Sequence, residues 1–86
     1  MKIEDKYLDF NLKIQNQLKE ELEKIRKGES KHEFHQIYHI LQEVKRMETE
    51  KGLTPYYPRI IVDSWDYNDV LGMDLLKLVN LYKGLR

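Results

Sequence analysis

Apolar residues recur every three or four positions over the first 25 residues, and this spacing constrains the fold more than any other feature of the chain. Such a stripe marks one face of a long helix. Gly28 follows the stripe, at a place where glycine commonly ends a helix. Residues 8–14 also alternate between apolar and polar side chains, so a strand over residues 7–14, paired with residues 60–62, remains the alternative. The stripe consists of Ile3, Tyr7, Phe10, Ile14, Leu18, Leu22 and Ile25.

A second helix is predicted after residue 30. Ser30 and Glu33 have the spacing of a capping box, in which each side chain bonds the backbone N–H of the other residue. Gly52 ends this helix, and Pro55 prevents it from continuing. Its predicted apolar face consists of Phe34, Ile37, Tyr38, Leu41 and Val44.

Residues 70–85 are apolar nearly all round, as in a helix at the centre of a core or in an interface. We expect Asp63 or Ser64 to cap this helix, because short polar side chains accept hydrogen bonds from the first N–H groups of a helix. Gly72 either permits close approach of another helix or separates a short turn at residues 66–71 from the final helix. The three segments together predict an all-α fold, with three main helices in an antiparallel bundle, as a single small domain over residues 1–86.

The connection between the second and third predicted helices is long and aromatic. Residues 54–65 contain Tyr56, Tyr57 and Trp65, and the apolar run of residues 60–62. Connections of about a dozen residues without regular structure are uncommon in compact domains and are often functional. We expect the apolar run and Trp65 to pack against the helices. Tyr56 and Tyr57 are the predicted partner contacts, because tyrosine offers a large rigid surface at low entropic cost.

Composition excludes several classes of function. Fifteen basic and fifteen acidic residues balance, whereas a general nucleic-acid binder needs a basic surplus. The absence of cysteine excludes disulfides and thiolate metal sites. No apolar run reaches the roughly 18 residues of a membrane span, and charges from Lys2 onward argue against a secretory signal. The sequence therefore predicts a cytoplasmic protein without a nucleic-acid or membrane partner.

The sequence carries no pattern typical of an enzyme. It has no glycine-rich phosphate loop and no serine or cysteine nucleophile motif, so we expect neither catalysis nor a cofactor. His32, His35 and His39 fall within one sector of the second predicted helix. His35 and His39, one turn apart, could hold a metal ion. The favoured interpretation is a solvated polar face that titrates near neutral pH.

Residues 30–65 resemble the immunity proteins that protect bacteria against their own nuclease colicins and pyocins. The resemblance rests on Tyr56-Tyr57-Pro58, on the Ser30–Glu33 opening of the second helix and on the apolar pattern from Phe34 to Val44. It implies four helices, with the Tyr-Tyr-Pro at the end of a very short third helix. It also implies central toxin contacts by the two tyrosines. The specificity surface that it implies on the second helix consists of His32, Glu33, Gln36 and Glu43.

The predicted function is that of a non-enzymatic protein-interaction module. Its predicted contacts are Tyr56, Tyr57, Glu33, Gln36 and Glu43. A homodimer through the first helix is a second mode of association, because that helix is long and its stripe is nearly heptad. An immunity-type protein and a metal-binding protein are the alternatives.

Overall fold

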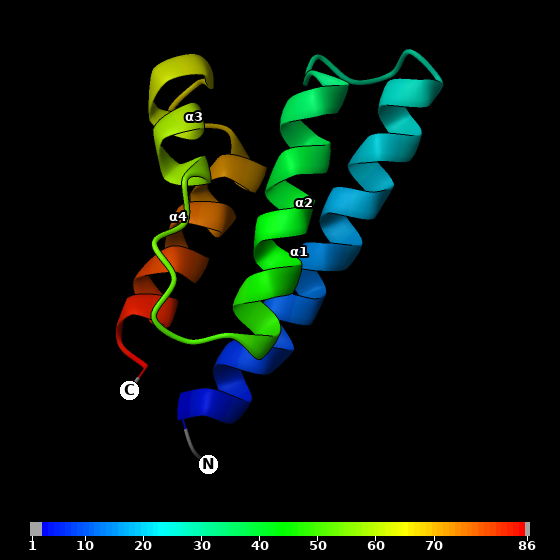
Figure 1. Ribbon diagram of the computed structural model, residues 1–86. Helices are drawn as coiled ribbons and strands as arrows, with labels where there is room; N and C mark the ends of the chain where they lie inside the picture. The colour runs from blue at the N-terminus through cyan, green and yellow to red at the C-terminus, as the bar shows by residue number, and fades with distance from the viewer. Residues whose placement is uncertain (1–2, 86) are drawn as a thin grey trace.

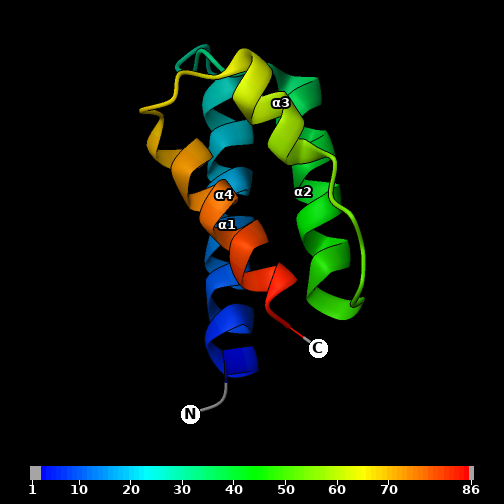
Figure 2. The same ribbon diagram turned by 90° about the vertical axis from the view of Figure 1, so that its left-hand side faces the viewer.

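Four helices make up the computed structural model, which describes residues 3–85 and the side chains from residue 5 onward. The helices are α1 (Ile3–Arg26), α2 (Phe34–Thr49), α3 (Tyr57–Ser64) and α4 (Val70–Lys83). Figure 1 shows that the chain runs up α1, down α2, up α3 and down α4, so neighbouring helices are antiparallel. Seen from a second side, α3 lies against the upper part of α2, and α4 lies along α1 (Figure 2). The all-α prediction is confirmed, and the three-helix bundle is matched only in part, because a fourth helix, α3, occupies the aromatic connection.

The first helix is continuous through residues 7–14, so the strand alternative for that segment is wrong. The helix ends at Arg26, and Gly28 follows with a φ of 77°. The backbone N–H of Glu29 donates to the carbonyl of Lys24 at 2.8 Å, which closes the left-handed turn that glycine permits. Gly28 therefore ends the helix as predicted. The side chain of Ile3, the first member of the predicted stripe, lies outside the described residues.

The second helix begins at Phe34, and the predicted capping box does not form. Glu33 is the N-cap residue, but its side chain makes no capping hydrogen bond. Ser30 instead donates to the carboxylate of Glu21 on α1, and its hydroxyl accepts from the backbone N–H of His32 at 3.0 Å. Ser30 therefore bonds to the carboxylate of Glu21 on α1 and does not cap α2.

The buried face of α2 differs from the predicted face at its first turn. Phe34 and Tyr38 are about half exposed, and their rings stack with centroids 6.1 Å apart. The residues of α2 that are buried are Ile37, Ile40, Leu41, Val44 and Met47.

The third helix starts where a carboxylate of α2 reaches the chain. Glu43 accepts hydrogen bonds from the backbone N–H groups of Tyr56 and Tyr57, at 2.6 and 2.7 Å. Pro58 follows in the first turn, where its missing N–H costs nothing. Pro58 therefore lies where a helix begins.

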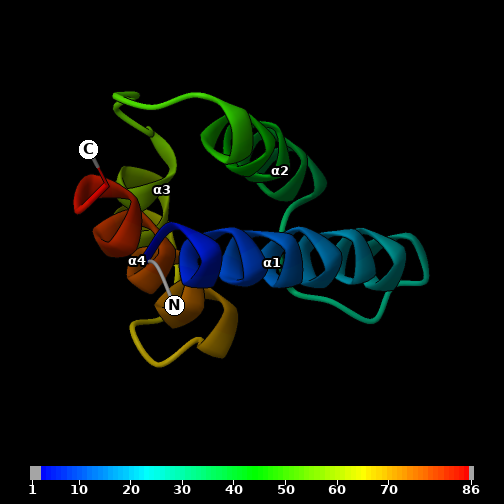
Figure 3. The ribbon, with the colours of Figure 1, turned by 90° about the horizontal axis from the view of Figure 1, so that it is seen from below.

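The fourth helix is capped by Asp69, whose side chain accepts from the backbone N–H of Gly72 at 3.1 Å. The prediction that Asp63 or Ser64 caps it is wrong, because both residues lie in the last turn of α3. Seen from below, α2 and α4 lie at different positions around α1 (Figure 3). α4 therefore covers a part of α1 that α2 leaves open.

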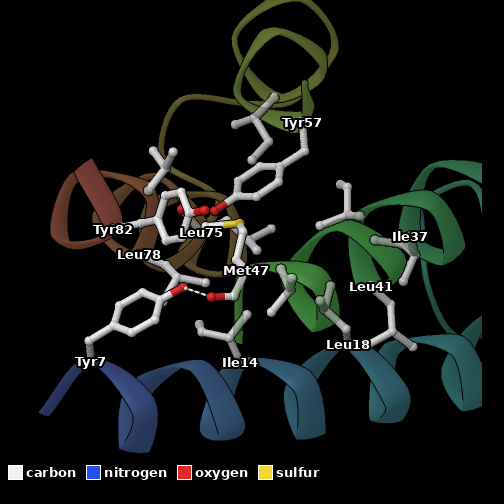
Figure 4. Close-up of a cluster of buried hydrophobic side chains, with 14 residues drawn as sticks. Tyr7, Ile14, Leu18, Ile37, Leu41, Met47, Tyr57, Leu75, Leu78 and Tyr82 are labelled. Carbon is white, nitrogen blue, oxygen red and sulfur yellow. Dashed lines mark hydrogen bonds between the residues drawn. The ribbon is translucent and has the colours of Figure 1, made fainter. Parts of the chain in front are cut away.

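Tyrosines of three helices point into the core (Figure 4). The hydroxyl of Tyr7 donates to the carbonyl of Met47 at 2.9 Å, and that of Tyr82 donates to the carbonyl of Glu50 at 2.7 Å. Burial raises the pKa of Tyr7 to about 12. Each buried hydroxyl is therefore satisfied by a backbone carbonyl of another helix or its end.

The apolar stripe of α1 is covered within the same chain. Tyr7, Ile14 and Leu18 are buried in the core that α2 and α4 complete. The homodimer through the first helix stays a prediction, and the part of the stripe that is buried in this core is not available to it. Within residues 3–85 we find no helix with both the length and the apolar character needed to cross a membrane.

Candidate functional site

The two tyrosines predicted to bind a partner have opposite environments. Tyr56, the N-cap residue of α3, is 58% exposed. Tyr57 is 0% exposed, and its hydroxyl donates to the carbonyl of Leu75 on α4 at 2.7 Å. Burial raises the pKa of the Tyr57 hydroxyl, and the nearby Tyr7 and Glu43 raise it further. The prediction that Tyr57 is a surface contact is wrong, because it is the side chain that ties α3 to α4.

Two of the three predicted contacts on α2 also support the fold. Glu43 holds the start of α3, as described above, and Gln36 accepts a hydrogen bond from Nε1 of Trp65 at 3.0 Å. Glu33 is exposed at the N-cap of α2. Of the five predicted contact residues, only Tyr56 and Glu33 therefore present mainly exposed side chains to a partner.

A histidine links the last part of α1 to the start of α4, at one end of the bundle. Nδ1 of His32 lies 2.5 Å from a carboxylate oxygen of Glu21 on α1. Nε2 lies 2.8 Å from a carboxylate oxygen of Asp69, the cap of α4. The imidazole also packs against the indole of Trp65, with ring centroids 4.3 Å apart. We call Glu21, His32 and Asp69 the histidine clamp.

The clamp favours a protonated imidazole. Burial alone lowers the pKa of His32, but the hydrogen bonds to Glu21 and Asp69 and the charges of both carboxylates outweigh it, so the pKa is raised. Burial likewise raises the pKa of Glu21, but hydrogen bonds from Ser30 and His32 outweigh it and the pKa is lowered. In the protonated ring both nitrogens can donate to these carboxylates, and neither keeps a lone pair with which to accept another proton.

The three histidines do not share one helical face. His32 precedes α2, whereas His35 and His39 are exposed on α2. Nε2 of His39 lies 3.7 Å from a carboxylate oxygen of Glu43. Within residues 3–85, no three histidine, aspartate or glutamate side chains are grouped so that they could hold a metal ion.

An apolar groove lies between α3 and the start of α4. Its volume is about 150 Å³, and an apolar cavity of about this size can hold a benzene molecule. Three apolar side chains around it are largely exposed: Val62 at 72%, Tyr67 at 95% and Met73 at 57%. We call this feature the α3–α4 groove, and it is the candidate functional site. The residues that line it are Ile61, Val62, Trp65, Asp66, Tyr67, Gly72, Met73 and Leu76.

Gly72 allows the two helices to approach at the base of the groove. A Cβ atom at this position would lie 3.1 Å from Cε3 of Trp65 and 3.3 Å from Cγ2 of Ile61, closer than ordinary contact. Trp65 is itself fixed by Gln36 on one edge and by His32 on one face. The wall of the groove is therefore formed before any ligand arrives.

The residues of this site stood out in the sequence, but their pattern predicted burial in the core. Val62 belongs to an apolar run for which burial was expected, yet of that run only Ile61 is fully buried. Met73 and Leu76 belong to the helix that is apolar nearly all round, and such a helix is typical of a core or an interface. The sequence alone did not show which side of α4 is left partly exposed, because this follows from the position of α3 in the fold.

Comparison of the chain with family models, with curated proteins and with solved structures found no match.

Proposed function

We propose that this chain is a non-enzymatic protein-interaction module that binds a partner through the α3–α4 groove. The observation that carries the proposal is the exposure of Val62, Tyr67 and Met73 around an apolar hollow. Exposed apolar side chains gathered in one place mark protein interaction sites far more often than scattered ones do. Methionine also adapts its shape to different apolar partners.

The rigidity of the groove supports the same proposal. Its tryptophan wall is held by a hydrogen bond to Gln36 and by the imidazole of His32. A preformed site loses less conformational entropy on binding than a flexible one. The exposed pair of Phe34 and Tyr38 is a weaker candidate, because their rings stack on each other and thereby cover part of their own apolar surface.

Site-specific photo-crosslinking in the producing cell tests the proposal. A benzophenone amino acid at Tyr67, which is almost fully exposed, should form one discrete adduct. Met73→Asp should abolish that adduct, because it places a charge in the apolar groove. The matched control places the same amino acid at Tyr38, which is also exposed but lies on α2, away from the residues that line the groove. An adduct of equal yield from Tyr38, or one insensitive to Met73→Asp, would contradict the proposal.

The immunity-type function is a second candidate, and the short third helix of a four-helix chain supports it. Two features differ from that family. Tyr57 and Pro58 open α3 here instead of ending it, and the buried Tyr57 leaves only Tyr56 for a toxin. The candidate predicts that the purified chain inhibits a colicin-type nuclease and that Tyr56→Ala relieves the inhibition. A nuclease that stays fully active with the chain in excess would count against it.

A further inference from the structure

We infer that the partner segment in the α3–α4 groove is an amphipathic helix whose polar face is basic. The inference rests on the proposed function and adds the chemistry of the partner. It is carried by the charge around the groove, by the shape of the hollow and by the position of one tryptophan.

The charged residue that lines the groove is acidic, although the whole chain is neutral. Between Arg59 and Lys77 the chain carries Asp63, Asp66, Asp69 and Asp74 and no lysine or arginine. Asp66 lines the groove itself, and no hydrogen bond or ion pair engages its carboxylate within residues 3–85. An apolar hollow with an acid at its rim fits a ligand that has an apolar anchor beside basic side chains.

The nearest basic groups do not reverse this sign. Lys77 lies over the ring of Phe10 on α1, 5.6 Å from its centroid. Lys31 and His32 line the hollow on the other side of Trp65, together with the acids Glu33, Asp66 and Asp69. The charge of His32 is shared with Glu21 and Asp69 in the clamp. Asp66 therefore remains the charge that faces the groove.

The shape of the groove suits a helix better than an extended strand. Its walls are the sides of two helices, so they offer no row of unpaired backbone groups that a strand could join. The hollow takes one apolar side chain, and Val62, Met73 and Leu76 extend the apolar surface beside it. An amphipathic helix inserts one side chain and lays its neighbours, three or four residues away, along such a surface.

The tryptophan of the groove gives a direct readout. Trp65 is the only tryptophan of the chain and lines the groove, so its fluorescence reports on occupancy. Three tryptophan-free peptides of equal length serve as probes. One is an amphipathic leucine–lysine helix, one is the matched leucine–glutamate helix, and one has the leucine–lysine composition in a scrambled order without an apolar face.

We expect the leucine–lysine helix to shift the Trp65 fluorescence and to bind about tenfold or more tightly than the leucine–glutamate helix, a ratio that falls at high salt. Asp66→Asn should weaken the leucine–lysine helix several-fold and leave the leucine–glutamate helix unchanged or tighter. Met73→Asp should abolish binding of the leucine–glutamate helix and strongly weaken the leucine–lysine helix. Circular dichroism checks that both variants keep the helical content of the parent chain.

Each contrary outcome overturns a defined part of the inference. Equal binding of both charged helices, abolished by Met73→Asp, overturns the basic partner but leaves the groove as a docking site. Equal binding of the scrambled peptide overturns the helix. If no peptide binds and the Trp65 signal changes with protein concentration, the groove holds a second copy and the inference is wrong. The crosslinking at Tyr67 tests the proposed function separately, because it needs no assumption about charge.

Discussion

Tyr56 and Tyr57 are neighbours in the sequence, but Tyr56 is exposed and Tyr57 is buried against α4. Substituting Tyr57 by Phe removes the hydrogen bond to the Leu75 carbonyl and leaves the ring in place. We expect the free energy of unfolding to fall by about 1 kcal/mol, the usual net value of such a bond. Tyr56→Phe is the matched control and should change it by less than about 0.5 kcal/mol. Urea denaturation measures both, and equal effects would mean that Tyr57 is not held as described.

His32 carries the pH dependence of the fold. Its pKa is raised on folding above the ordinary 6.5, so its contribution to stability is complete below pH 6.5 and is lost as the pH rises through the higher value of the folded state. The pKa of Glu21 is lowered below the ordinary 4.5, so its contribution is present above pH 4.5 and is lost as the pH falls through the lower value. The clamp therefore stabilises the fold most between pH 4.5 and pH 6.5.

The matching experiment replaces His32 by Gln. Near pH 5.5 we expect a loss of about 1.5–3 kcal/mol in the free energy of unfolding, as for hydrogen bonds to charged groups. Near pH 9 the loss should be clearly smaller, because the clamp of the parent chain is then weakened too. His35→Gln, at an exposed histidine of α2, is the control and should show no such trend. A loss that does not vary with pH would show that His32 is not protonated in the folded chain.

At the scale of the helices, Glu43 on α2 caps the start of α3. Glu43→Ala removes the acceptor of the Tyr56 and Tyr57 N–H groups. We expect a loss of about 1–2 kcal/mol, as for other helix caps. Faster hydrogen exchange at those two amides should accompany it. Glu33→Ala is the control, since its side chain caps nothing. Unchanged exchange at Tyr56 and Tyr57 in the Glu43 variant would contradict this role.

The helices differ in how far the sequence could predict them. The first helix and its end at Gly28 follow from local spacing and from the φ that glycine permits. The start of α2 did not, because Ser30 bonds to Glu21, a residue of another element. The local patterns missed α3 for the same reason, since its cap comes from Glu43 on α2. Local patterns predict a helix well unless a side chain of another helix forms hydrogen bonds at its end.

At the scale of the whole molecule, the candidate site exists only after folding. Trp65 reaches its place through Gln36 and His32, which lie about thirty residues earlier in the chain. The pattern of apolar residues predicted the core well, since Ile14, Leu18 and Leu78 are buried as expected. Apolar spacing alone did not reveal that Val62 and Met73 remain exposed. The sequence therefore favoured the tyrosines, whereas the folded chain exposes Val62 and Met73 instead of Tyr57.

Amide chemical-shift mapping of the chain with the leucine–lysine helix tests most directly whether the α3–α4 groove is the binding surface. We expect the largest shifts at residues 61–76 and at the indole N–H of Trp65, with Phe34 to Tyr38 nearly unchanged. Met73→Asp should strongly reduce these shifts at the same peptide concentration, while the remaining spectrum stays that of the folded chain. Largest shifts on α2 or along α1, or shifts of undiminished size in the Met73 variant, would contradict the proposed site.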